Sequence, residues 1–499
     1  MDVETHFKKL AVIGCGSMGG GLALLFAENG MQVFLNDPAE ETVNALLQKS
    51  KDEGLGDRLF KRENYKALCQ ALDRPRVLFL SLPHGTTGDV VVEGLHPYLE
   101  SGDIIVDASN ENWENTQRRQ GKLVAQGVLY IGCGVSGGYQ AARRGPSMSP
   151  GGDDKALDQV MPFFKMVAAK DSRGKPCVGK IGQGGAGHYV KMIHNGIEHG
   201  MMSSLAEAWS IMDKILDMGY DEIGDVFLSW NAEGELKENF LVAIGAQICK
   251  QKDEQGSHVL GLVQDKVVQD VDGSEGTGIW SQQEAVRLHI PAPSLSTAHY
   301  LRLASADRAQ RERVKETFGG DFPIQKLSLS QAEKQAFIED LRKAVYVGCL
   351  AAYVQGMTII DKADREMRWG IDFRTVVQIW RAGCIIRSDH IADLLENIFN
   401  HRGDDDGVRN LLFESRVAEE LKGGFASLKR IVAKAVEVNA IIPSLSATLD
   451  WLKYSGNVDL PTSFYEAELD FFGKHMFDLR SENAGEPVTG KHHFEWKPA

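Results

Sequence analysis

Four polar side chains that could move protons lie at helical spacing in the segment HYVKMIHNGIEHG. They are Lys191, His194, Asn195 and Glu198. On an α-helix these positions fall within an arc of about 100°, so they form one stripe on one face. A desolvated lysine can act as a base near neutral pH, and a carboxyl group in the same dry cleft can act as an acid. The stripe therefore predicts paired proton transfer, with Lys191 as base and Glu198 as acid, although a solvated helix face has the same periodicity.

The place of this stripe in the chain favours chemistry over plain solvation. It begins directly after the glycine-rich segment IGQGGAGH, where short apolar runs give way to long helical patterns. Such a change predicts a domain boundary, and clefts form at domain boundaries. A lysine, a histidine and an amide on one stripe are also an unusual mixture for a face that only meets water.

A second group of residues predicts a dinucleotide site near the N-terminus. Gly14, Gly16 and Gly19 follow an apolar strand and begin a helical pattern. Glycines at this spacing allow a tight turn and close approach of a pyrophosphate to the helix N-terminus. The predicted cofactor-binding residues are Gly14, Gly16, Ser17, Met18, Gly19, Asn36, Asp37 and Asn110.

Asp37 is the residue from which we predict the cofactor. It closes the next strand, where a carboxylate can accept hydrogen bonds from the ribose hydroxyls and would repel a 2′-phosphate. No arginine or lysine follows it in the sequence Asp37-Pro-Ala-Glu-Glu41. We therefore expect NAD to be preferred over NADP.

The elements around these residues alternate between strand and helix in the first third of the chain. Strand-like runs are expected at 10–16, 32–37, 77–82, 103–109 and 128–134, with amphipathic stretches such as 18–29 between them. This alternation predicts a parallel sheet covered by helices on both faces. We expect a Rossmann-type α/β domain over 1–184, a large all-helical domain over 185–457 and an extended C-terminal tail over 458–499.

Composition excludes several other classes of protein. The 499 residues carry a formal net charge of −14, which argues against nucleic-acid binding because that needs clustered positive charge. The seven cysteines are widely separated and form neither a disulfide framework nor a metal site, which fits the reducing cytoplasm. The sequence shows neither a secretory signal nor an uninterrupted membrane-spanning run.

Several long segments resemble the 6-phosphogluconate dehydrogenase family in the same order along the chain. They are GCGSMGGGLALLFAENG, GVSGGYQAARRGPSMSPGG, GGAGHYVKMIHNGIEHG, GSEGTGIW, IWRAGCIIRS and FFGKHMF. The resemblance covers roughly residues 10 to 477. It implies a coenzyme domain, an all-helical domain and a tail that threads into the partner subunit of a homodimer.

The resemblance also implies a reaction, the oxidation and decarboxylation of a 3-hydroxy sugar acid. Lys191 would remove the hydroxyl proton as hydride passes to the nicotinamide, and Glu198 would protonate the enediol left after loss of CO2. The residues expected to bind substrate are Asn110, Ser136, Gly137, Gly138, His194, Asn195, His199, Glu275, Thr277, Arg302 and His475.

The departures from the family pattern cluster where the family holds the substrate phosphate. Glu275 stands where the family has lysine, Leu469 where it has arginine, and His199 where it has tyrosine, while Tyr139 replaces a glutamate after the double glycine. The first two changes shift the local charge by three units. At about 1 kcal/mol per unit this weakens phosphate binding by roughly two orders of magnitude. We therefore expect an NAD-dependent, decarboxylating dehydrogenase for a sugar acid related to 6-phosphogluconate, with or without the phosphate.

Three other functions remain open at this point. An ordinary 6-phosphogluconate dehydrogenase could hold the phosphate through Arg302, His475 and residues such as Arg143, Arg144 or Lys474. A non-catalytic dinucleotide-binding regulator is disfavoured by intact Lys191 and Glu198. Reduction of an imine or keto group is compatible with Tyr139 and His199, but no residue selects it.

Overall fold

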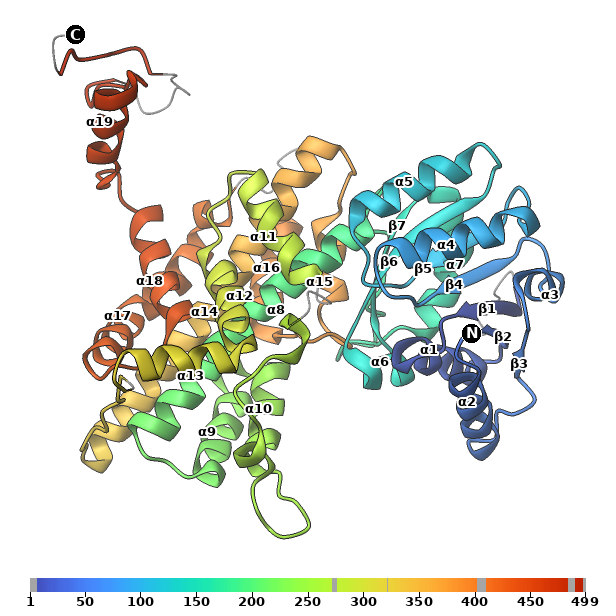
Figure 1. The fold of residues 1–499 in the computed structure, drawn as a ribbon, viewed down its shortest axis with the longest axis horizontal. Coiled ribbons are helices and arrows are strands. Elements are labelled where there is room, and N and C mark those ends of the chain that lie inside the picture. The colour runs from blue at the N-terminus through green and yellow to red at the C-terminus, as the bar shows by residue number, and fades with distance from the viewer. Residues whose placement is uncertain (1–6, 272–275, 321, 402–409, 483–489, 497–499) are drawn as a thin grey trace. The chain divides into compact units, whose positions relative to one another are not determined.

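A seven-stranded sheet organises the first part of the chain in the computed structural model, which describes residues 7–271, 276–320, 322–401, 410–482 and 490–496. The strands are β1 (Lys9–Ile13), β2 (Gln32–Asn36), β3 (Leu59–Lys61), β4 (Val77–Leu80), β5 (Ile104–Asp107), β6 (Leu129–Ser136) and β7 (Ser147–Gly152). They lie in the order β3-β2-β1-β4-β5-β6-β7, and all neighbours are parallel except the antiparallel pair β6 and β7. The predicted parallel-rich sheet is therefore confirmed (Figure 1).

Helices cover both faces of this sheet, as the alternation predicts. They are α1 (Ser17–Glu28), α2 (Glu40–Asp52), α3 (Tyr65–Gln70), α4 (Thr86–Leu95), α5 (Trp113–Val124), α6 (Gly138–Arg144) and α7 (Asp154–Val167). Along β1, Leu10 and Val12 belong to a core shared with α1, α2 and α7, whereas Ala11 and Ile13 belong to a core shared with α3, α4 and α5. Successive side chains of a strand point to opposite faces, so the central strands β1, β4 and β5 each contribute to both cores.

Two strands were not predicted, for different physical reasons. β3 has only three residues, too few for a recognisable pattern. β7 has the sequence SMSPGG, whose proline and glycines are typical of a turn. It forms because it pairs antiparallel with β6 at the sheet edge, where a proline is tolerated.

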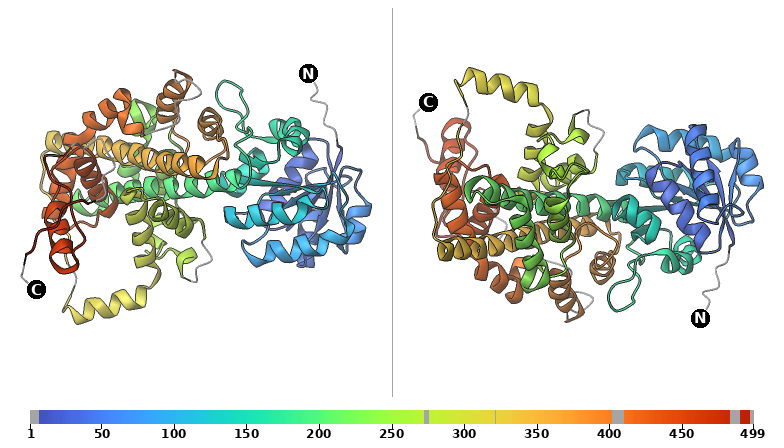
Figure 2. Two further views of the ribbon diagram at one scale, coloured as in Figure 1. Left: turned by 90° about the horizontal axis from the view of Figure 1, so that it is seen from above. Right: turned by 90° about the horizontal axis from the view of Figure 1, so that it is seen from below.

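The middle of the chain is almost entirely helical. Its helices are α8 (Ala186–Ser210), α9 (Tyr220–Ala232), α10 (Phe240–Lys250), α11 (Thr277–Arg287), α12 (Pro293–Ala306), α13 (Arg308–Thr317), α14 (Gln331–Met367), α15 (Phe373–Ile379), α16 (Asp389–His401), α17 (Ser415–Glu437) and α18 (Pro443–Ser455). The two longest, α8 and α14, pack side by side (Figure 2). The predicted helical part is confirmed.

Helix α14 is long and apolar enough to cross a membrane by length and composition alone. However, 94% of its most apolar stretch is buried against other parts of the protein. It packs against α8, α12 and α17. This burial is typical of the central helix of a globular core.

The helices α12 and α18 begin with the same four residues, Pro-Ser-Leu-Ser, and their first turns are held in the same way. The backbone N–H of Ser294 donates to the side chain of Gln355 at 3.1 Å. The N–H groups of Ser444 and Leu445 donate to Glu207 at 2.7 and 2.9 Å. Buried polar side chains from α14 and α8 thus satisfy helix N-termini that have no partner of their own. This correspondence indicates an internal repeat in the helical part.

The chain divides into two compact units, residues 1–448 and 449–499. The second contains α19 (Thr462–Gly473), so the expectation of a wholly extended tail is wrong. The buried carboxylate of Asp470 accepts hydrogen bonds from the backbone N–H of Met476 and the side chains of His493 and Trp496. These bonds fold the last described residues back onto the helix. The domain limits at 184 and 457 stay predictions.

Candidate active site

The turn between β1 and α1 has the close contacts that a dinucleotide loop requires. Gly14 has a φ of 92°, and a Cβ added there would lie 2.1 Å from the carbonyl oxygen of Ser81. A Cβ added at Gly19 would lie 1.9 Å from the carbonyl oxygen of Gly14. Gly16 precedes α1 and has open space at its Cβ position, which leaves the helix N-terminus accessible to an anion. The turn therefore fits a pyrophosphate group.

Asp37 follows β2, and its carboxylate is anchored beside this turn. It accepts the backbone N–H groups of Cys15 at 2.7 Å and Ala39 at 2.8 Å. Each oxygen keeps a further lone pair that a ribose hydroxyl can use. An arginine that was not predicted, Arg62, follows the adjacent strand β3. Its backbone carbonyl accepts from the side chain of Asn36 at 2.8 Å, and its guanidinium lies over the ring of Phe34 on β2, 4.7 Å from the ring centre. Arg62 is remote from Asp37 in sequence, so inspection of the residues after Asp37 did not find it.

A cavity of about 540 Å³ lies at the carboxyl ends of β4, β5 and β6, against α8. This is the edge at which open α/β sheets bind their ligands. Predicted site residues on its walls are Met18, Asn110, Ser136, Gly137, Gly138, Lys191, Asn195, Glu198 and Thr277. The proposed base and the proposed acid therefore face the same space.

Three residues of the predicted stripe on α8, Lys191, His194 and Asn195, form a connected hydrogen-bond network. Lys191 is only 8% exposed, and its Nζ donates to Asn195 Oδ1 at 2.6 Å. The amide of Asn195 in turn donates to the hydroxyl of Thr277 on α11 at 2.8 Å. This amide fixes the lysine amine at the cavity wall and joins α8 to α11.

His194 is buried beside these groups and holds the last residue of β6. Its Nδ1 donates to Asn195 Oδ1 at 3.0 Å, so its Nε2 is the acceptor for the hydroxyl of Ser136, also at 3.0 Å. Burial, and then the charge of Lys191, keep the pKa of His194 well below its usual value. A neutral imidazole with one donor and one acceptor is what these two bonds require.

The close packing of α8 on the sheet depends on a glycine, which has no side chain, at the contact. A Cβ added at Gly134 of β6 would lie 2.2 Å from the Cβ of Lys191 and 2.5 Å from the hydroxyl of Ser149. Any larger residue would push the helix away from the strand. Gly134 therefore determines how far Lys191 stands from the carboxyl end of β6.

The predicted Arg302 lies on α12 and contacts α8 in an arrangement that was not predicted. Its Nε donates to Asp270 at 2.8 Å, and its Nη1 donates to Nε2 of His199. The Asp270 side chain is 2% exposed, and the ring of His199 stacks on that of His299 at 6.0 Å. The guanidinium charge is therefore already compensated by a buried carboxylate that was not predicted.

The protein family follows from comparison with known proteins. The model described as the NAD binding domain of 6-phosphogluconate dehydrogenase matches residues 9–182, and the model of that enzyme's C-terminal domain matches residues 187–496. The chain belongs to the 6-phosphogluconate dehydrogenase family. This family assignment confirms the predicted resemblance.

Similar proteins carry the name 6-phosphogluconate dehydrogenase, decarboxylating. One from Emericella nidulans is 43% identical over 97% of this chain and 100% of its own length. One from Lactococcus lactis is 33% identical over 97% of this chain and 98% of its own length. The Plasmodium falciparum 6-phosphogluconate dehydrogenase, solved as apoenzyme and with NADP+ or 6-phosphogluconate, is 30% identical. It superposes with a TM-score of 0.86 over 98% of this chain and 100% of that one.

Other predicted residues of this family member are less completely placed. Glu275 lies outside the described residues, so its role in substrate binding stays a prediction. His475 follows α19 in the second unit, and its role at the cavity is likewise a prediction. Tyr139 is the second residue of α6, directly after Gly138 of the cavity wall, and is 65% exposed.

The structure also adds residues that sequence reasoning missed. His84 and Gln269 line the same cavity, and the ring of His84 meets that of Trp280 edge-on at 5.1 Å. His84 follows β4, the strand next to β1. The rule that ligands bind after the carboxyl ends of central strands would have selected it.

Proposed function

We propose that this protein is a dinucleotide-dependent dehydrogenase that oxidises and decarboxylates a 3-hydroxy sugar acid. The observation that carries the proposal is the shared cavity of Lys191 and Glu198, next to a turn that fits a pyrophosphate. The names of the similar proteins make 6-phosphogluconate the first candidate substrate.

In this reaction neutral Lys191 takes the proton of the C3 hydroxyl as the C3 hydride leaves. The bound nicotinamide cofactor supplies the hydride acceptor. The lysine ammonium then faces the new C3 ketone and stabilises the negative charge that develops there when the bond to the carboxyl carbon breaks and CO2 leaves. Lys191 returns its proton to the C3 oxygen, which gives the enediol. Glu198, in its protonated form, then donates a proton to C2 while Lys191 takes the C3 hydroxyl proton again, and the ketone product forms. Asn195 orients the lysine amine throughout, since it holds Nζ at 2.6 Å.

A second candidate substrate is the corresponding sugar acid without a phosphate. It is favoured by the compensated charge of Arg302, by Leu469 in place of an arginine, and by Glu275 in place of a lysine. Comparing kcat/KM for 6-phosphogluconate and gluconate separates the two. The first candidate requires a preference for the phosphorylated acid of at least about 100-fold, since phosphate contacts are charge-assisted. Equal or better use of gluconate supports the second.

The double variant Glu275→Lys, Leu469→Arg tests, by changing the protein and not the substrate, whether these two positions weaken phosphate binding. If these two positions weaken phosphate binding, the variant gains kcat/KM for 6-phosphogluconate and not for gluconate. No gain would show that the phosphate is held elsewhere.

NAD is the proposed cofactor, because Asp37 presents a carboxylate where the 2′-phosphate of NADP would bind. Arg62 on the next strand end is the group that could offset this repulsion. The ratio of kcat/KM for NAD+ and NADP+ tests the choice. Asp37→Ser should shift the ratio toward NADP+, whereas a wild-type preference for NADP+ would refute it.

A homodimer in the cytoplasm, with each tail completing the partner's site, is also part of the proposal. The exposed aromatic side chains of the second unit support a docking role for it: Phe464, Tyr465, Phe472 and Phe494. All seven cysteines are buried thiols without disulfides, which suits a reducing compartment.

A further inference from the structure

Two loops of the coenzyme domain form adjoining parts of the cavity wall. The loop after β4 contributes Ser81 to His84, and the loop after β5 contributes Ala108 to Asn110. His84 and Asn110 therefore depend on the separation of these loops. Loops of this kind need support from the scaffold behind them if they are to hold side chains at fixed positions.

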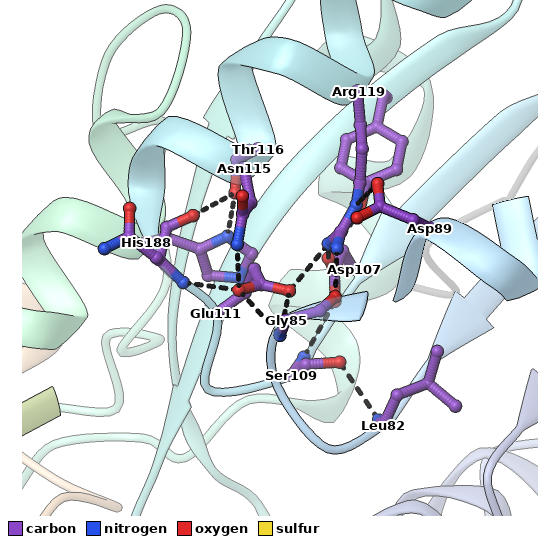
Figure 3. Close-up of polar contacts among 12 residues, drawn as sticks. Leu82, Gly85, Asp89, Asp107, Ser109, Glu111, Asn115, Thr116, Arg119 and His188 are labelled. Atoms are coloured by element: carbon purple, nitrogen blue, oxygen red, sulfur yellow. Dashed lines mark hydrogen bonds and ion pairs between the residues drawn. The ribbon is translucent and has the colours of Figure 1, made fainter. Parts of the chain in front are cut away.

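A buried arginine on α5 lies behind both loops. Arg119 is 1% exposed, and its guanidinium donates to the carbonyl of Gly85 and to the carboxylate of Glu111, both at 2.7 Å. It also contacts Asp89 at 3.2 Å and Asp107 at 3.4 Å. Figure 3 shows the guanidinium between the two loops, with the acidic side chains around it. One side chain is thus bonded to the ends of both loops.

Glu111 completes the connection from the other loop. Its two oxygens accept the backbone N–H of Gly85 at 3.2 and 3.1 Å, and one of them also accepts the N–H of Asn112 at 2.8 Å. The N–H and the carbonyl of Gly85 are therefore held by Glu111 and Arg119, respectively. A further bond joins the loops nearer the strands, from the N–H of Leu82 to the hydroxyl of Ser109 at 3.0 Å.

Helix α5 also contacts α8, the helix that carries Lys191. The hydroxyl of Thr116, one turn before Arg119 on α5, lies 2.7 Å from Nδ1 of His188. His188 is buried and stands three residues before Lys191 on α8. Helix α5 is therefore hydrogen-bonded to the loops after β4 and β5 through Arg119, and to α8 through Thr116.

We propose that the buried Arg119–Glu111 pair is a positioning clamp that fixes the separation of the two loops and thereby places His84 and Asn110 relative to Lys191. Neither residue of the clamp lines the cavity, so it acts through the loops. The catalytic part of the inference rests on the proposed function. The structural part, namely that the Arg119–Glu111 pair restrains the two loops, is independent of the proposed function.

The neighbouring Arg118 provides a matched control. It lies on the same helix and binds the same Asp89 at 2.7 Å, but its side chain is 42% exposed, and its hydrogen bonds are to Asp89 and Asn115 and not to either loop. The variants to compare are Glu111→Gln, Arg119→Met, Arg119→Lys and Arg118→Met. Glu111→Gln keeps the size and one acceptor oxygen but removes the charge, so it stays informative if Arg119→Met does not fold.

Hydrogen exchange and steady-state kinetics are measured for each folded variant. We expect Glu111→Gln and Arg119→Met to exchange faster at 81–85 and 108–112, and to lose about 10- to 100-fold in kcat with a much smaller change in KM, because misplaced groups slow the chemical step. Arg119→Lys should recover part of the loss, and Arg118→Met should match the wild type. Unchanged loop exchange and unchanged kcat in Glu111→Gln would overturn the clamp.

Failure of the proposed function and failure of the clamp can be told apart. If the wild type turns over no sugar acid, the proposed function fails, and the exchange comparison still decides whether the pair restrains the loops. If the wild type is active and the loops loosen without loss of kcat, only the catalytic part of the inference is wrong.

Discussion

Lys191 is the residue on which the proposed reaction depends most directly. Its amine shares the carbonyl oxygen of Asn195 with the ring of His194, so a single amide holds two neighbouring side chains of the same helix. The stripe that periodicity alone left open to a solvated helix face is therefore a buried network at a cavity wall. Its geometry suits a base that must keep one orientation.

Replacing Lys191 by methionine tests its role. The variant should lose at least about 1000-fold in kcat, because general base catalysis and stabilisation of the ketone are both removed. Binding of the dinucleotide, measured by calorimetry, should stay close to that of the wild type. Residual turnover within about tenfold of the wild type would mean that another group removes the proton.

His199 predicts a pH dependence of stability. Burial, and then the charge of Arg302, hold its pKa well below the usual value, and its Nε2 must stay unprotonated to accept from Arg302. Below pH about 6.5 the unfolded chain binds a proton here that the native protein does not. This group therefore lowers the free energy of unfolding as pH falls, by up to about 1.4 kcal/mol per pH unit.

The measurement is Tm between pH 7.5 and 5.0 for the wild type and His199→Gln. The variant should lose less Tm on acidification, because glutamine does not titrate. The exposed His96, replaced in the same way, controls for loss of an imidazole. Parallel curves for His199→Gln and the wild type would contradict the assignment.

At the scale of helices, the repeated Pro-Ser-Leu-Ser starts show how the helical part is assembled. Glu207 and Gln355 perform the same task at α18 and α12, but only Glu207 ionises. Burial raises its pKa to about 7. Between pH about 4.5 and 7 the native state keeps a proton that the unfolded state releases, so stability falls as pH rises through this window.

The variant Glu207→Gln should remove this loss of stability with rising pH, because glutamine does not titrate. We expect the Tm of the variant relative to the wild type to rise between pH about 5 and 7 and to stay level above pH about 7. The reciprocal variant Gln355→Glu should show the opposite trend, because it introduces a buried carboxyl group at the equivalent helix start. A Tm difference that is independent of pH in both variants would exclude titration of Glu207 in this range.

At the scale of the whole molecule, the role that we propose for the second compact unit depends on assembly of a dimer. A chain ending at residue 458 lacks α19 and His475. If each tail completes a partner's site, this truncation should lose at least about 100-fold in activity, while unit 1 still binds the dinucleotide. The loss reflects missing substrate contacts, each worth a few kcal/mol when charge-assisted.

Mixing two inactive proteins tests the exchange itself. Truncated chains, which keep Lys191, are refolded together with full-length Lys191→Met chains, which keep the tail. Heterodimers should regain activity, because the tail of the second chain completes the site of the first. Refolding either protein alone is the control, and no gain in the mixture would rule out tail exchange.

The sequence by itself determined the features that depend on local spacing. The glycine turn, five of the seven strands and the stripe on α8 follow from backbone geometry, in which helical and strand periods fix which side chains share a face. The family resemblance added roles for these residues. The same local patterns could not find β7, whose SMSPGG sequence becomes a strand only by pairing with β6.

Only the tertiary structure decided the contacts between distant segments. Asp270 compensates Arg302, Arg62 stands near Asp37, and Arg119 joins two loops, although each partner is far away in the sequence or hidden among ordinary charged residues. Such contacts depend on the path of the chain and on burial, which strengthens a few charge pairs among many. Sequence spacing specifies which residues can act together on one element, whereas packing specifies which elements bring them to one site.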